Sequence, residues 1–210
     1  MATGERPPLH TGLIIATLLT LLALLILAVP LAREVIRELN GDRWVWGILA
    51  TGALVRLLLP GRLVEMGIGY QLTRLAEELI LPRYGAGTTT LHHLIFQVFG
   101  VDHDVMLATH RVIGCLTLPL ATACASRLVS RWQITPGPWF VPMWAAALAW
   151  TPALVRSDVT ESNLVPVLLG LWVGLFGWMS LSGWRRPMAT VAGLLLAGLS
   201  RPEMAAVAPA

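Results

Sequence analysis

The sequence predicts an all-α membrane protein, a single polytopic bundle of about six transmembrane helices. Apolar residues make up 56% of the 210-residue chain, charged residues only 13%, and the mean hydropathy is +0.70. Soluble domains carry roughly 25% charged residues, so this composition argues against a water-soluble fold. The apolar residues also gather in runs close to the length of about 20 that a ~30 Å hydrocarbon layer requires.

Polar or helix-breaking residues separate these runs. Pro60 and Gly61 end the second run, because proline lacks the backbone donor that a helix needs and glycine permits a turn. The first run is too long for the core of a signal peptide, so we expect a retained anchor. The predicted spans are 12–32, 44–59, 105–129, 139–155, 163–181 and 188–199, with a polar segment at 62–104 between the second and third.

The arginines predict how the bundle is oriented. The connections 33–43, 127–131 and 185–186 together carry seven arginines, and short loops rich in arginine stay on the cytoplasmic side. The 62–104 segment and the end of the last span then face outward. The net charge of +3 is ordinary for such a protein. No basic patch is interleaved with aromatics, so nucleic acid is not an expected partner.

Two short helices are predicted in the outer segment. Apolar residues recur at helical spacing over 68–79 with charged residues between them, which predicts an amphipathic helix lying on the membrane. Tyr84 then begins a glycine-rich turn, and the apolar stretch 91–99 predicts an interfacial or re-entrant helix.

Glu65 is the acid nearest the exit of the second span, and its neighbours are apolar. Such neighbours would keep water away from the carboxylate, as a base poised to accept a proton requires, although a solvated loop acid is the alternative. His92, His93 and the Asp-His-Asp run at 102–104 are of types that bind divalent metals. Their spacing matches no recognised site, so we expect interfacial histidines and no cofactor.

Several charged residues lie within or beside the predicted spans. An arginine near the bilayer centre costs roughly 2.5–3.5 kcal/mol, so Arg56 and Arg111 either reach outward to the interface or have a functional role. Arg201 lies at the outer end of the last span, and a guanidinium matches the geometry of phosphate oxygens. The nearby outward-facing acids are Glu203, Asp158 and Glu161.

In their local sequence and in their order along the chain, four motifs resemble those of the GT-C superfamily of membrane glycosyltransferases. This superfamily includes protein mannosyltransferases and aminoarabinose transferases of lipid A. These motifs are ALVRLL at 53–58, LPRYG at 81–85 leading to VFG at 98–100, TESNLVP at 160–166, and AGLLLAGLSRPE at 192–203. The last is the most telling, and the resemblance covers the chain from Trp44 onward.

The resemblance implies transfer of a sugar from a polyprenyl-phosphate carrier to an acceptor on the outer side of a bacterial inner membrane. By position, Glu65 would be the catalytic base and Arg201 would steady the departing phosphate. Tyr84, Glu203, Asp158, Glu161 and Arg111 would complete the substrate-binding set.

Two features depart from the family pattern. The acid of this loop is often an aspartate or an acidic pair, whereas Glu65 stands alone, and family members usually have more than six spans. We therefore expect the chain to be the N-terminal part of such an enzyme. The alternative is a non-catalytic scaffold or a small transport component, in which Arg56, Arg111 and Glu203 would follow an internal path.

Overall fold

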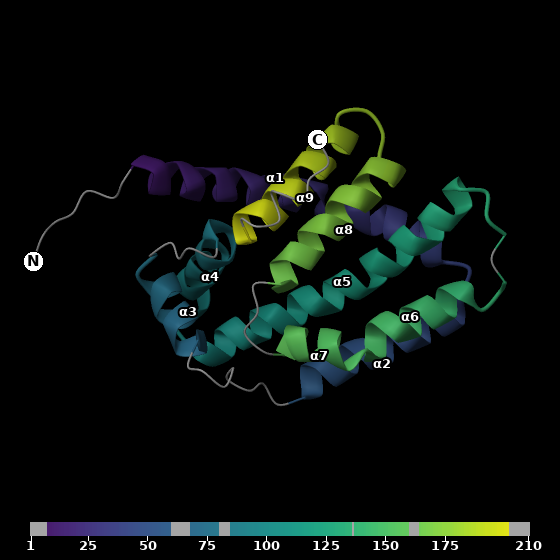
Figure 1. Cartoon of the computed structure of the whole chain (residues 1–210), viewed down its shortest axis with the longest axis horizontal. Coiled ribbons are helices and arrows are strands. Elements are labelled where there is room, and N and C mark those ends of the chain that lie inside the picture. The colour runs from purple at the N-terminus through teal and green to yellow at the C-terminus, as the bar shows by residue number, and fades with distance from the viewer. Residues whose placement is uncertain (1–7, 60–67, 80–84, 136, 160–163, 202–210) are drawn as a thin grey trace, which may run out of the picture.

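The computed structural model describes residues 8–59, 68–79, 85–135, 137–159 and 164–201, and throughout these ranges the chain is helical, without strands (Figure 1). This confirms the all-α prediction. The helices are α1 (Pro8–Leu39), α2 (Arg43–Leu58), α3 (Ile68–Glu77), α4 (Ala86–Phe99), α5 (His103–Arg131), α6 (Phe140–Trp150), α7 (Pro152–Val159), α8 (Leu164–Ser180) and α9 (Arg185–Ser200).

Two of the described helices, α1 from Thr11 onward and α5, are long and apolar enough to cross a membrane, and each offers 29 residues. The other predicted spans form shorter helices. α2 and α9 have 16 residues each, and at 1.5 Å per residue such a helix extends about 24 Å. Length and composition thus indicate membrane association through α1 and α5.

Two of the predicted spans differ most from the observed helices. α1 continues to Leu39 instead of ending at residue 32, and an ion pair between Glu34 and Arg37 (2.6 Å) joins successive turns of the extension. The predicted span 139–155 is interrupted at Thr151, where α6 ends and α7 begins with Pro152. Proline disfavours helical backbone in the residue before it, which accounts for the break.

The arginine-rich connections meet at one end of the bundle. Arg127, near the end of α5, pairs with Glu38 (3.1 Å) and Glu34 (3.7 Å) of α1. Its Nε also donates to the hydroxyl of Ser180, the last residue of α8, at 3.3 Å. The ends of α1, α5 and α8 and the start of α9 therefore lie together, as the orientation inferred from sequence requires. We call this the arginine end.

α8 and α9 form an antiparallel pair whose backbones are in close contact (Figure 1). A Cβ added at Gly193 would lie 2.4 Å from the carbonyl oxygen of Gly170 and 2.4 Å from the amide nitrogen of Gly174. Only glycine permits this approach. Gly170 and Gly174 of α8 therefore pack against the backbone of α9 within the same chain.

The main apolar core surrounds this pair. It is built from buried side chains of α1, α2, α5, α6, α8 and α9, among them Leu27, Val45, Leu118, Ala145 and Phe176. The core extends from the middle of the bundle to the arginine end, and α4, α7 and the start of α5 lie at the opposite end. We call the latter the polar end, because it holds the buried side chains of His92, His110, Arg56 and Asp158.

Candidate functional site at the polar end

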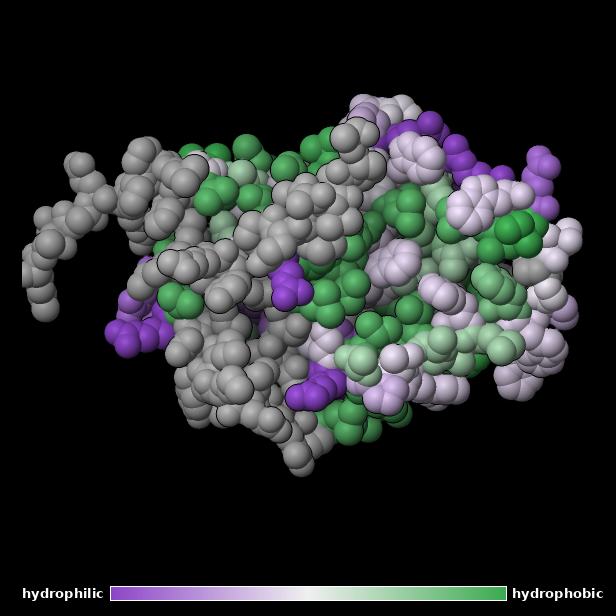
Figure 2. All heavy atoms as spheres, viewed as in Figure 1, coloured by the Kyte–Doolittle hydropathy of each residue, from purple (hydrophilic) through white to green (hydrophobic). Residues whose placement is uncertain are grey.

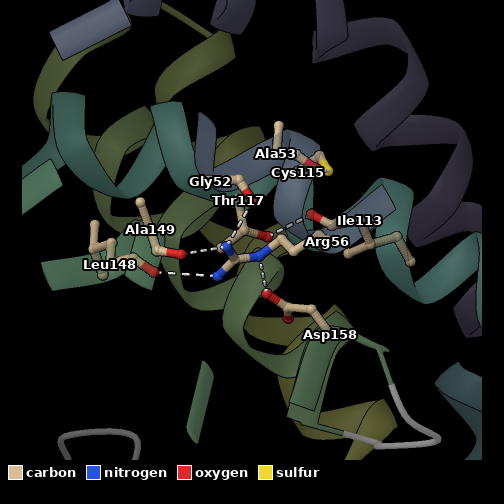
Figure 3. Close-up of polar contacts among 9 residues, drawn as sticks. All are labelled: Gly52, Ala53, Arg56, Ile113, Cys115, Thr117, Leu148, Ala149 and Asp158. Atoms are coloured by element: carbon tan, nitrogen blue, oxygen red, sulfur yellow. Dashed lines mark hydrogen bonds and ion pairs between the residues drawn. The ribbon is translucent and has the colours of Figure 1, made fainter. Parts of the chain in front are cut away.

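Arg56 is the largest fully buried side chain of the described residues, with 1% of its surface exposed. Its Nε donates to Oδ2 of Asp158 at 2.6 Å (Figure 3). Its Nη1 donates to the carbonyls of Gly52 (3.1 Å) and Ala149 (2.8 Å), and its Nη2 donates to that of Leu148 (3.1 Å). Four of the five N–H donors of the guanidinium are thus engaged within the protein, which excludes for Arg56 the alternative of reaching outward to the interface.

The position of Arg56 follows from the break between α6 and α7. The last carbonyls of a helix have no partner within it. Leu148 and Ala149 belong to the last turn of α6, and Arg56 supplies the donors that their carbonyls lack. Arg56 therefore caps α6 and, through Asp158, also holds α7.

Asp158 is 6% exposed and packs against α5 where that helix has no side chain. A Cβ added at Gly114 would lie 2.5 Å from the carboxyl carbon of Asp158. A cavity of about 160 Å³ adjoins the ion pair, and Thr117, Trp144 and Trp172 contribute to its walls. Asp158, which the family resemblance assigns to substrate binding, is therefore engaged by Arg56.

A second polar pair contacts α5 one turn before Gly114. Its member on α5 is His110, which lies on the same face as Gly114 because residues four apart on a helix are neighbours. His110 of α5 and His92 of α4 meet edge to face, with ring centroids 4.8 Å apart and an interplanar angle of 81°. Both side chains are buried, with exposed fractions of 0% and 1%. His92 is thus buried within the protein because α4 is packed into the bundle, and its position at the membrane interface stays a prediction.

The tautomer of His92 is fixed by its backbone contact. Its Nδ1 donates to the carbonyl of Thr88 at 2.7 Å, which leaves Nε2 as an unprotonated acceptor. Burial and, to a smaller extent, the neighbouring His110 lower the pKa of His92 to about 3, against the smaller opposing effect of the Thr88 bond. His92 is thus neutral at physiological pH.

Further buried polar atoms surround this pair. Among the described residues no hydrogen-bond partner is found for Nε2 of His92 or for the hydroxyls of Thr88, Thr90 and Ser200. Ser200 belongs to the junction because a Cβ added at Gly87 would lie 2.6 Å from its Oγ. Leaving a buried polar group unpaired costs about 1–3 kcal/mol, so several such groups together mark a place suited to a polar partner.

Two arginines border the polar end. Arg201 is exposed and follows Ser200 at the end of α9, and its backbone N–H donates to the carbonyl of Ala197 at 3.0 Å. The α9 end lies against the start of α4, since a Cβ added at Gly85 would lie 2.2 Å from the Ser200 carbonyl oxygen. Arg111 is half-buried on α5, and its Nε has no hydrogen-bond partner among the described residues.

The structure brings together part of the predicted site. α9 with Arg201, α5 with Arg111 and α7 with Asp158 all meet at the polar end. The other predicted site residues, Glu65, Tyr84, Glu161 and Glu203, lie outside the described residues. No cluster of three potential metal ligands occurs within the described ranges.

The sequence reasoning missed His110, Ser200 and the buried threonines of α4. A signal for His110 was present, since ionisable residues, histidine included, are rare within membrane spans and usually face the bundle interior. The threonine run 88–90 precedes the predicted helix 91–99, and α4 begins five residues earlier than expected, at Ala86. That earlier start buries the run.

The chain matches no protein-family model, no curated protein and no solved structure.

The buried state of His92 predicts a specific dependence of stability on pH. The folded-state pKa of about 3 lies below the ordinary value of 6.5, so only the unfolded chain binds this proton between those values. Stability should therefore fall as the pH drops from 6.5 towards 3, by up to about 1.4 kcal/mol per pH unit from this group. Unfolding in detergent micelles at a series of pH values measures the slope.

Two variants make this pH experiment specific. His92→Phe should remove the contribution and flatten the curve over that range, whereas His93→Phe, at the half-buried neighbouring position, should leave most of it in place. Equal slopes in the wild type and in His92→Phe would contradict the assignment.

Proposed function

We propose that the chain is the N-terminal part of a polytopic GT-C-type glycosyltransferase of a bacterial inner membrane. In this proposal α1, α2, α5, the α6–α7 pair, α8 and α9 are six crossing elements, and the arginine end faces the cytoplasm. The enzyme moves a sugar from a polyprenyl-phosphate carrier to an extracytoplasmic acceptor. The observation that carries the proposal is the gathering of buried polar groups at the end opposite the arginine end.

The competing proposals are a transport component and a scaffold. A transporter needs polar groups that continue along the bundle to the cytoplasmic side. Among the described residues, the buried polar groups of the polar end give way to the apolar core around Leu118, Ala145 and Phe176 before the arginine end is reached. A one-ended polar site suits a reaction confined to one membrane surface.

The chemistry assigns each charged group a separate task. Glu65 takes the proton of the acceptor hydroxyl as its oxygen attacks the anomeric carbon, and the bond from that carbon to the carrier phosphate breaks. The phosphate departs with its negative charge, which Arg201 stabilises. Arg111 is available for the same phosphate, whereas Arg56 is not, because its donors are already used by Asp158 and by backbone carbonyls.

Glycosyl transfer tests the proposal directly. Membranes containing the full-length protein would be supplied with a panel of polyprenyl-phosphate sugars, and modified acceptors would be identified by mass spectrometry. Glu65→Gln should lower the rate by at least about 100-fold, the lower end of what removing a general base costs. Arg201→Ala should also lower the rate, because it removes a charge at the departing phosphate.

Matched controls lie at the end of α3, where Arg74 belongs to the helix and Glu78 directly follows it. Glu78 and Arg74 pair with each other at 3.1 Å, with 44% and 78% of their side-chain surfaces exposed. Glu78→Gln and Arg74→Ala should therefore leave the rate close to that of the wild type. Full activity in Glu65→Gln would remove the proposed base, and the absence of transfer to any acceptor would favour a scaffold.

A further inference from the structure

A groove on the outer side of the α8–α9 pair ends at Trp178, whose ring is in contact with the guanidinium of Arg131. The groove has a volume of about 530 Å³, within the range of roughly 300–1,000 Å³ typical of ligand clefts. Its walls include Leu168, Leu175 and Trp178 of α8 together with Leu194 of α9. The glycine contacts that draw the two helices together leave this groove beside them.

The dimensions of the groove match one leaflet of a bilayer. Leu168 and Trp178 are ten residues apart on α8, which corresponds to about 15 Å along the helix. This is half of the ~30 Å hydrocarbon thickness. Trp178 is the groove residue nearest the arginine end, and tryptophan is enriched at the level of lipid headgroups.

Arg131 supplies a positive charge at that end of the groove. Its guanidinium carbon lies 4.5 Å from the centre of the Trp178 ring, a cation–π contact between the end of α5 and the groove wall. Arg127, one turn earlier, pairs with Glu38, whereas Arg131 is exposed and forms no ion pair with a described carboxylate. In Figure 2 the hydrophilic residues of this region gather at the upper right, where the α8–α9 turn and the end of α5 lie.

We propose that this groove binds one anionic phospholipid of the cytoplasmic leaflet, with an acyl chain along α8 and α9 and the headgroup phosphate on Arg131. The cytoplasmic leaflet is the anionic one, and each basic side chain near its surface contributes about 1 kcal/mol of attraction. The inference depends on the proposed membrane orientation but not on glycosyl transfer, so the two can fail separately.

Native mass spectrometry of the full-length chain tests the proposal. The protein would be released from mixed micelles containing equal amounts of phosphatidylglycerol and phosphatidylcholine, and the retained lipids would be counted. We expect phosphatidylglycerol to be preferred. Arg131→Gln should reduce that preference about fivefold, the factor that corresponds to about 1 kcal/mol. Leu194→Trp should fill the groove and reduce retention of both lipids.

Arg43→Gln is the matched control, because Arg43 is also an exposed arginine at the arginine end but does not line the α8–α9 groove. It should keep the wild-type preference. Equal losses in Arg43→Gln and Arg131→Gln would show diffuse attraction to the whole basic surface and overturn the site. Unchanged retention in Leu194→Trp would likewise place the lipid elsewhere, and a circular dichroism spectrum matching that of the wild type confirms that each variant is folded.

Discussion

Arg56→Ala is expected to lower the free energy of unfolding by about 3–5 kcal/mol, the range found when one partner of a buried ion pair is removed. The substitution leaves Asp158 without its cation and leaves the last carbonyls of α6 without donors. It also releases three elements at once, since Arg56 of α2 holds both α6 and α7. Unfolding by SDS titration in detergent micelles, followed by circular dichroism, measures the loss.

Three further variants separate the effect of charge from that of geometry. Arg56→Lys keeps the charge but cannot reproduce the planar fork that donates in several directions, so it should recover only part of the loss. The double variant with Asp158→Leu and Arg56→Met should lose less stability than either single variant, because no unpaired charge remains in it. Arg74→Ala removes an exposed ion pair and should change stability by less than about 1 kcal/mol. A loss in Arg56→Ala no larger than that in Arg74→Ala would contradict the capping role.

Gly193→Leu is expected to separate α8 from α9 and to cost about 3 kcal/mol or more, at or beyond the upper end of ordinary overpacking. The added Cβ would meet the backbone of Gly170 and Gly174 at 2.4 Å, and backbone atoms cannot turn aside as a flexible side chain can. The same unfolding titration measures the effect. Crosslinking between cysteines introduced on α8 and α9 would report the distance between the two helices. A loss of crosslinking in Gly193→Leu would show that the destabilisation comes from separation of the pair.

Gly198→Ala provides the control within the same helix. A Cβ added at Gly198 meets no atom within 4 Å, so alanine fits there without displacement. Because glycine is a poorer helix former than alanine by about 0.8–1 kcal/mol, this variant should be as stable as the wild type or more stable. Comparable destabilisation by Gly193→Leu and Gly198→Ala would show that the close helix contact is not what holds the pair together.

The helices that could be predicted are those whose own residues determine them. α1 and α5 follow from long apolar runs, and the meeting of the arginine-rich connections follows from their charge. Pro152 predicts the break at Thr151, but the apolar run around it has the length of a span and predicts one continuous helix. Local sequence therefore predicts most of the helices, but it predicts their ends less well.

The candidate site was harder to predict because its contacts join distant parts of the chain. Arg56 and Asp158 are 102 residues apart, and no local pattern indicates that a guanidinium will cap another helix. The burial of His92 within the protein could not be predicted because the depth of α4 depends on the glycine contacts of Gly85 and Gly87 with Ser200, which only the assembled bundle creates. The position of Arg201 at the end of α9 could be predicted because the residue directly follows the apolar run that forms this helix.

The long sequence separation between Arg56 and Asp158 also determines how long Arg56 waits for its partner during synthesis. Ribosomes add about 5–20 residues per second, so Asp158, 102 residues later, is made roughly 5–20 s after Arg56. During that interval α2 holds a guanidinium whose acid partner does not yet exist, at a cost of about 2.5–3.5 kcal/mol if it lies near the bilayer centre. α2 therefore reaches its final state only when α7 has been made.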